Sequence, residues 1–101
     1  MDLIITKKND EKNLTIALEG TLDTMTSPQL EAELEQIPSG TENLVFDFEK
    51  LAYISSAGLR AMIGAEKKIS AKNGAMKIIN VSEILKEIFD VTGLSGALGI
   101  E

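Results

Sequence analysis

The chain has 101 residues, a hydrophobic fraction of 44% and a formal net charge of −6, which is typical of one folded globular domain. It contains no cysteine and no histidine, which excludes disulfides, thiolate catalysis, the commonest metal ligands and a Ser-His-Asp triad. The acidic balance disfavours binding to nucleic acid, so we expect protein partners. Without cysteine and histidine, we expect no metal, and we also expect no cofactor.

The N-terminal part of the sequence predicts two strands joined by a polar turn. Residues 3–8 and 13–20 are strand candidates, and residues 9–12 form the turn. In the second strand, the large apolar side chains of Leu14, Ile16 and Leu18 alternate with Thr15, Ala17 and Glu19. The chain does not open with a basic segment followed by an apolar one, and no apolar run approaches the roughly 18 residues of a membrane span. We therefore expect a cytoplasmic protein that does not enter the membrane.

The next segment, residues 24–37, predicts a helix. Thr26 followed by Gln29 fits a capping box, and Ser27 followed by Pro28 fits an N-cap with proline at the first helical position. One apolar face is formed by residues with helical spacing, namely Leu30, Leu34 and Ile37. A Pro-Ser-Gly sequence then ends the helix.

The middle of the chain predicts a buried strand and a second helix. Residues 44–51 form a mostly apolar run, as expected of a central buried strand. The helix is expected to begin at Ser56 or Ala57 and to end at Asn73-Gly74, a good left-handed stop. Its apolar stripe comprises Leu59, Met62, Ile63 and Ile69.

The last third predicts another strand, residues 75–80, and a third helix, residues 82–93. Ser82 is the expected N-cap of this helix and Gly93 its C-terminal cap. The side chains expected to face the core are Ile84, Leu85, Ile88 and Phe89. Residues 97–101 could add a short edge strand.

The element order β-β-α-β-α-β-α predicts one α/β domain over residues 1–101. Strands separated by helices imply parallel pairing through right-handed crossovers, while the first hairpin adds an antiparallel edge. We therefore expect a mixed sheet with helices packed against it. Ser55 and Ser56 then lie at the carboxyl end of a central strand, where open α/β sheets usually place their functional site.

The junction at residues 53–60, Tyr-Ile-Ser-Ser-Ala-Gly-Leu-Arg, has several possible roles. A serine nucleophile lacks a histidine base and the G-x-S-x-G turn, and a phosphate-binding loop has weak support from one glycine without a Walker lysine. Ser55 or Ser56 could cap the helix while Gly58 allows close packing. Alternatively, Ser56 could accept a phosphate, which adds roughly −1.5 to −2 charge where the helix dipole tolerates it.

Three segments carry a longer pattern. Residues 18–34 contain a strand, a glycine, an Asp and a helix. Residues 43–62 contain an apolar strand with an Asp, followed by two hydroxyl residues and Gly-Leu. Residues 74–94 end in the pattern Phe-x-x-x-Gly-Leu. In this order they resemble the STAS domain family, and within it the free-standing bacterial anti-sigma factor antagonists. The resemblance covers almost the whole chain.

The resemblance implies a monomeric partner-switching protein that regulates transcription. Its unphosphorylated form would bind an anti-sigma factor, a serine kinase of the histidine-kinase-like ATPase type, and release the sigma factor. The kinase would then phosphorylate one serine and end the interaction, and a serine phosphatase would reset it. The chain would be a substrate and not an enzyme. One alternative is a STAS scaffold or sensor subunit without phosphoryl transfer. Another is a small enzyme, which the missing His and Cys argue against.

The resemblance also implies the site residues. The acceptor is Ser56, two residues before the glycine, with Ser55 as the alternative because it stands where many members have Asp. Asp23 matches an acidic residue of the kinase-binding surface, although a turn residue would look the same. Asp47 matches a strand Asp that local backbone N–H groups could satisfy. We expect Leu59 to lie on an exposed first turn with Arg60. The implied partner-binding residues are Asp23, Thr24, Ser55, Ser56, Ala57, Gly58, Leu59 and Arg60.

Overall fold

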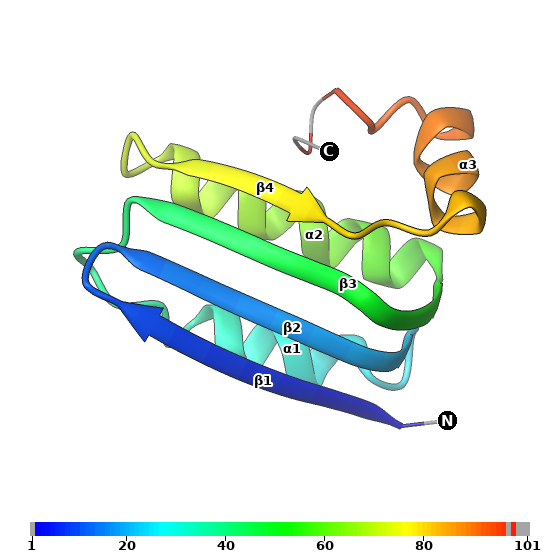
Figure 1. Cartoon of the computed structure of the whole chain (residues 1–101), viewed down its shortest axis with the longest axis horizontal. Helices are drawn as coiled ribbons and strands as arrows, with labels where there is room; N and C mark the ends of the chain where they lie inside the picture. Colours follow the sequence, from blue (N-terminus) through cyan, green and yellow to red (C-terminus); the bar gives the residue numbers. More distant parts are fainter. Residues whose placement is uncertain (1, 97, 99–101) are drawn as a thin grey trace.

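A computed structural model describes residues 2–96 and 98 and contains one four-stranded mixed sheet (Figure 1). The strands are β1 (Leu3–Asp10), β2 (Asn13–Leu22), β3 (Asn43–Ile54) and β4 (Ala75–Ile79), in the order β1-β2-β3-β4. β1 pairs with β2 antiparallel, whereas β2-β3 and β3-β4 are parallel. The helices are α1 (Ser27–Leu34), α2 (Ser56–Ser70) and α3 (Glu83–Val91). The mixed α/β sheet is therefore confirmed.

One face of the sheet is covered by α1 and α2, which lie behind it in Figure 1. Alternate strand residues are buried, as the period of a strand requires. These core residues are Leu14, Ile16, Leu18, Leu44, Phe46, Phe48, Met76 and Ile78. Leu30 of α1 and Met62 of α2 are also completely buried. Burial of each such side chain contributes roughly 1.5–3 kcal/mol, so this layer holds the ends of the strands and helices in place.

The third helix, α3, lies beyond the carboxyl end of β4 (Figure 1). Phe89 attaches it to the core, because its ring stacks on that of Phe48 at a centroid distance of 6.3 Å. Ser82 caps the helix as predicted, accepting a hydrogen bond from Leu85 N at 3.3 Å. Gly93 has a φ of 74°, which confirms the expected left-handed cap. Ile84 is 68% exposed, so the prediction that it faces the core was wrong.

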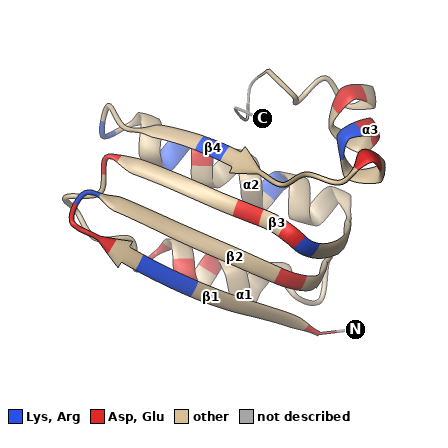
Figure 2. Cartoon of the chain, in the orientation of Figure 1, with Lys and Arg blue, Asp and Glu red and all other residues tan. Residues whose placement is uncertain are grey.

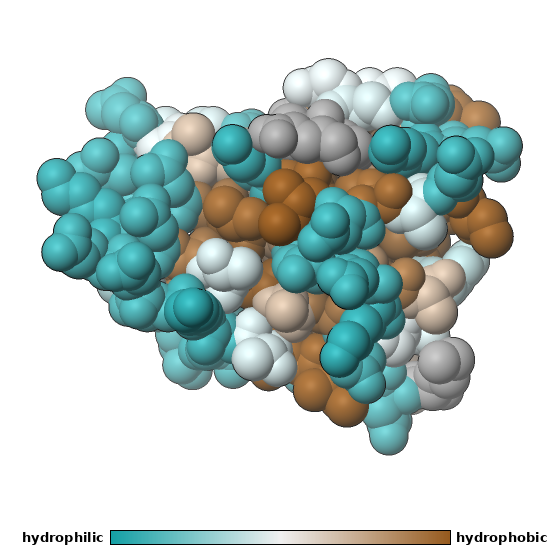
Figure 3. Space-filling model, viewed as in Figure 1, coloured by the Kyte–Doolittle hydropathy of each residue, from teal (hydrophilic) through white to brown (hydrophobic). Residues whose placement is uncertain are grey.

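The face of the sheet that α1 and α2 leave uncovered shows apolar surface in its middle, bordered by hydrophilic residues (Figure 3). Asp47 lies on this side, and its Oδ1 accepts hydrogen bonds from Glu49 N and Asn80 Nδ2, each at 3.0 Å. The carboxylate thus ties β3 to the segment after β4. This confirms the expectation that a local backbone N–H group helps to satisfy Asp47.

Irregular pairing between β2 and β3 shapes the end of the sheet. Ala17 pairs with Asp47 but Glu19 pairs with Lys50, so β3 contains an extra residue, and a second shift follows Gly20. Such bulges bend a strand and re-aim the residues after it. Gly20 has a φ of 106°, which other residues rarely adopt. The bulges let β3 extend three residues beyond the predicted end at position 51.

The helix boundaries differ from the expected ones at the first and second helices. Residues 24–37 were predicted to be helical, but α1 comprises only Ser27–Leu34. The second helix begins at Ser56, as predicted, but ends at Ser70, short of the expected end at Asn73-Gly74. Asn73 has the expected left-handed φ of 61°. The possible strand at residues 97–101 lies, apart from Leu98, outside the described residues.

Within the described part of the chain, no helix combines the length and apolar character needed to span a membrane.

Candidate functional site

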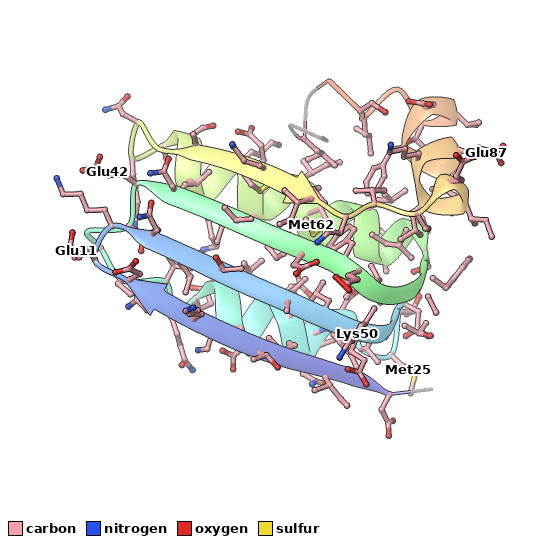
Figure 4. All side chains as sticks on the ribbon, in the orientation of Figure 1. Glu11, Met25, Glu42, Lys50, Met62 and Glu87 are labelled. Carbon is pink, nitrogen blue, oxygen red and sulfur yellow. The ribbon has the colours of Figure 1, made fainter. Side chains whose placement is uncertain are left out.

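The predicted site residues come from two segments that meet at one end of the sheet. The carboxyl ends of β2 and β3 lie there together with the first residues of α1 and α2 (Figure 1). Leu22 pairs with Ile54, and Ser55 N donates a hydrogen bond of 2.9 Å to Leu22 O. Met25 lies at this end, whereas Glu11 and Glu42 lie at the opposite end (Figure 4). The sheet thus brings the loop after β2 beside the loop after β3.

The loop after β2 is organised by Asp23. Asp23 Oδ1 accepts hydrogen bonds from Met25 N at 3.0 Å and from Thr26 N at 3.1 Å. Thr26 Oγ1 donates to Thr21 O at 2.8 Å and accepts from Asp23 N at 2.9 Å. These contacts hold the loop in a turn whose tip, Thr24 and Met25, is exposed. Asp23 therefore stabilises a turn, which was one of the two roles that the sequence suggested for it.

The capping box predicted for the first helix is not formed. Thr26 is the N-cap by position but makes no side-chain bond to the helix, because its hydroxyl is bonded within the preceding turn. Gln29 does not reach back to Thr26. Its Nε2 instead donates to Leu3 O at 2.8 Å and anchors α1 to the edge strand.

The two serines occupy different environments. Ser56 is the first residue of α2 and is exposed. Ser55 is the N-cap by position, with extended backbone, but its side chain makes no capping hydrogen bond. Its Oγ is buried and has no hydrogen-bond partner among the described residues. The expectation that a serine hydroxyl caps this helix was wrong, and only the Ser56 hydroxyl is open to a macromolecular partner.

A matched pair of substitutions tests this difference. We expect Ser82→Ala to lower the free energy of unfolding by about 1 kcal/mol, because it removes a real N-cap bond. Ser55→Ala should cost less than a few tenths of a kcal/mol, since no capping bond is lost and a buried polar atom is removed. Urea unfolding of both variants measures this, and an equal loss in the two would contradict the uncapped geometry of α2.

Gly58 and Leu59 hold the start of α2 against the sheet. A Cβ added at Gly58 would lie 2.7 Å from Ile54 Cγ1 and 2.8 Å from Leu22 O, so only glycine fits without displacement. Leu59 is 7% exposed and packs in the core, so the expectation that it lies on an exposed turn was wrong. The Gly-Leu pair thus positions the serines and does not itself form the open surface.

A shallow groove of about 240 Å³ lies between the first turns of α1 and α2. It contains the predicted residues Thr24, Ala57 and Arg60, and three residues that the sequence interpretation missed: Ser27, Pro28 and Glu31. Ser27 is 4% exposed, and its Oγ has no partner in the described part of the chain. Ser27 and Pro28 had been interpreted only as a helix start, although a helix start after a candidate binding loop also signals a shared surface.

Charged groups of both signs are spread over the strands and helices (Figure 2). In the groove itself the charged side chains are Glu31 and Arg60. Arg60 is exposed and makes no ion pair with any described residue. The described residues contain no cluster of three or more groups able to hold a metal ion. The groove thus contains one cation, Arg60, without an ion-pair partner among the described residues, on the helix that begins with the exposed Ser56.

Comparison with known proteins identifies the family of this chain. Residues 4–100 match the family model of the STAS domain. The chain is 27% identical to the anti-sigma-B factor antagonist of Bacillus subtilis (strain 168) over 100 residues, which is 99% of this chain and 92% of that protein. It is 28% identical to the anti-sigma-B factor antagonist of Staphylococcus aureus (strain NCTC 8325 / PS 47), covering 99% of this chain and 94% of that protein.

A solved structure has the same fold. The Bacillus cell fate determinant SpoIIAA, in its phosphorylated form, superimposes with a TM-score of 0.76 over 97% of this chain and 91% of that chain. The sequence identity is 20%, so the likeness concerns the fold.

Proposed function

The chain belongs to the STAS domain family, and from this membership we propose that it is an anti-sigma factor antagonist switched by phosphorylation of Ser56. The observation that carries the proposal is the environment of this serine. Its side chain is exposed at the start of α2, beside the Asp23 turn, and takes no part in capping. Two relatives that match almost the whole chain are named as antagonists of an anti-sigma factor, which supports the same role here.

In the proposed phosphoryl transfer this chain is the substrate. Ser56 Oγ attacks the γ-phosphorus of an ATP molecule bound to the kinase, the bond to the β,γ-bridging oxygen breaks, and ADP leaves. The hydroxyl proton passes to a base of the kinase, because this chain has no histidine and the described residues offer Ser56 no hydrogen-bonded base. The chain therefore acts as binding partner and phosphate acceptor, and the anti-sigma factor acts as the serine kinase.

The switch changes the surface and leaves the fold intact. The unphosphorylated chain binds the kinase through the Asp23 turn, Ser56 and the groove that contains Ala57 and Arg60, and the sigma factor is released. A phosphate adds roughly −1.5 to −2 charge to this surface. Because it sits at the N-terminus of a 15-residue helix, the helix dipole favours it and the core is undisturbed. A serine phosphatase restores the binding form.

The choice of Ser56 over Ser55 follows from accessibility. A kinase must bring the serine oxygen within bonding distance of the γ-phosphorus, which requires an exposed hydroxyl. Ser56 meets this condition, whereas the Ser55 oxygen is buried.

Mass spectrometry of the protein from its native cells tests the proposal. We expect one phosphate, mapped to Ser56 in peptides that separate it from Ser55, removed by phosphatase and changing in occupancy with growth conditions. A co-purified protein with an ATP-binding kinase fold would identify the partner. Absence of phosphate under all conditions, with the chain in a larger sensory assembly, would favour the scaffold role instead.

A further inference from the structure

The groove beside Ser56 contains an unpaired cation in an acidic protein. Arg60 is the only arginine of the sequence and, within the described residues, it has no ion-pair partner. Every salt bridge observed in the described residues uses a lysine, as in Lys68 with Glu35 at 3.1 Å. A guanidinium is suited to bidentate contact with a phosphate or carboxylate. Arg60, one helical turn from the candidate phosphate acceptor, is therefore available to bind an anionic group.

Ser56 and Arg60 lie four residues apart in α2. Side chains at this spacing lie on one face of a helix, one turn apart, close enough for an ion pair. The anion is on the N-terminal side of the cation, which is the more favourable order for such pairs. Both residues are exposed, so a phosphate on Ser56 and the guanidinium can meet without any change in the backbone.

We propose that a phosphate on Ser56 forms an ion pair with Arg60 and withdraws this side chain from the groove. For its biological role the inference rests on the proposed phosphorylation of Ser56. The contact itself is a property of the phosphorylated chain, however it is prepared.

The pair changes the groove as well as the serine. Before phosphorylation the groove contains one acidic and one basic side chain, Glu31 and Arg60. Once Arg60 is held by the phosphate, Glu31 is left as the charged side chain of the groove. A partner that contacts Arg60 through a carboxylate loses that contact and meets a negative surface instead. Phosphorylation thus ends binding both by adding an anion and by removing the cation that the partner uses.

The test uses the full chain with phosphoserine incorporated at position 56 during translation. Because a nearby cation stabilises the dianionic phosphate, the pKa of the phosphoserine, followed by ³¹P NMR, should be lower in the wild type than in Arg60→Gln by about 0.3 unit. Lys67→Gln removes the same charge from an exposed position of the same helix, eleven residues from Ser56. This control should change the pKa by no more than about a third of the Arg60→Gln effect.

A second readout follows from the single arginine. Its Nε–H gives one side-chain signal in a ¹H–¹⁵N spectrum, and this signal should move on phosphorylation in the wild type and in Lys67→Gln alike. Equal phosphoserine pKa values in Arg60→Gln and Lys67→Gln, with an unmoved Nε–H signal, would overturn the inference. Since phosphoserine is incorporated during translation, without the kinase, this result is independent of whether native cells phosphorylate Ser56, which mass spectrometry decides separately.

Discussion

Under the proposed function, replacing Ser56 by glutamate is expected to weaken binding of the partner kinase by about 30-fold or more, while Ser56→Ala binds like the unphosphorylated wild type. A charge forced into an interface without a counter-charge on the binding protein costs about 2–5 kcal/mol, and each 1.4 kcal/mol is tenfold in affinity. In the presence of ATP the wild type should be released over time, whereas Ser56→Ala should stay bound because it cannot be phosphorylated. Calorimetry with the co-purified kinase, with and without ATP, measures both effects.

The control for Ser56→Glu is Ser39→Glu, which adds the same charge at an exposed position in the loop before β3. This loop lies at the end of the sheet away from Ser56 (Figure 1). Ser39→Glu should therefore bind the kinase within about twofold of the wild type, since an exposed charge outside an interface has little effect on affinity. If the two glutamate variants lost affinity equally, the surface around Ser56 would not be the binding site.

Replacing Gly58 is expected to be the most damaging single change at the site for stability. Even alanine places a Cβ 2.8 Å from Leu22 O and 2.7 Å from Ile54 Cγ1, closer than real Cβ contacts. Relief requires α2 to move away from the ends of β2 and β3, and overpacking of this kind costs about 1–3 kcal/mol. The bulkier side chain in Gly58→Val should cost more. The free energy of unfolding in urea measures this loss.

Gly64 provides the matched control on the same helix. A Cβ added there has nothing within 4 Å, so Gly64→Ala should be neutral or stabilise the protein by up to about 1 kcal/mol, as expected for alanine in a helix. Equal stability of Gly58→Ala and Gly64→Ala would show that the close approach of α2 to Leu22 is not required.

The contact at Gly58 also explains why this junction has the form Ser-Ser-Ala-Gly-Leu. The glycine has an ordinary φ, and its role is to let the helix backbone approach the end of β2. Leu59 then fills the core behind it. The same packing carries Ser56 to the surface, which connects the stability of the junction to the exposure of the proposed acceptor.

Local patterns were sufficient for most of the fold. Alternation in residues 13–20 predicted β2, a mostly apolar run predicted β3, and Ser82 with Gly93 marked the ends of α3. These signals lie within a few neighbouring residues, so they do not depend on distant contacts. The order of these elements then implied the mixed sheet and the position of Ser56 at its edge.

The errors have a common physical cause. The capping box at Thr26 failed because its hydroxyl found partners in the Asp23 turn, and Gln29 found one on β1, 26 residues away in sequence. Ile84 was placed on the wrong side because helical periodicity gives a face but not the neighbour that covers it. Leu59 belongs to the apolar stripe of its helix, and the expectation of an exposed first turn was wrong because the core covers it. These outcomes depend on competition between groups that only the folded chain brings together.

For this protein the sequence by itself determined the strands and helices, their order, and the position of Ser56 at the start of a helix, because each is encoded by neighbouring residues. Tertiary structure decided which serine is open, why Gly58 cannot be larger, and that Arg60 and Glu31 share a groove with the Asp23 turn. Those properties arise where β2 and β3 end side by side, and such contacts join residues some 30 positions apart that no local pattern relates.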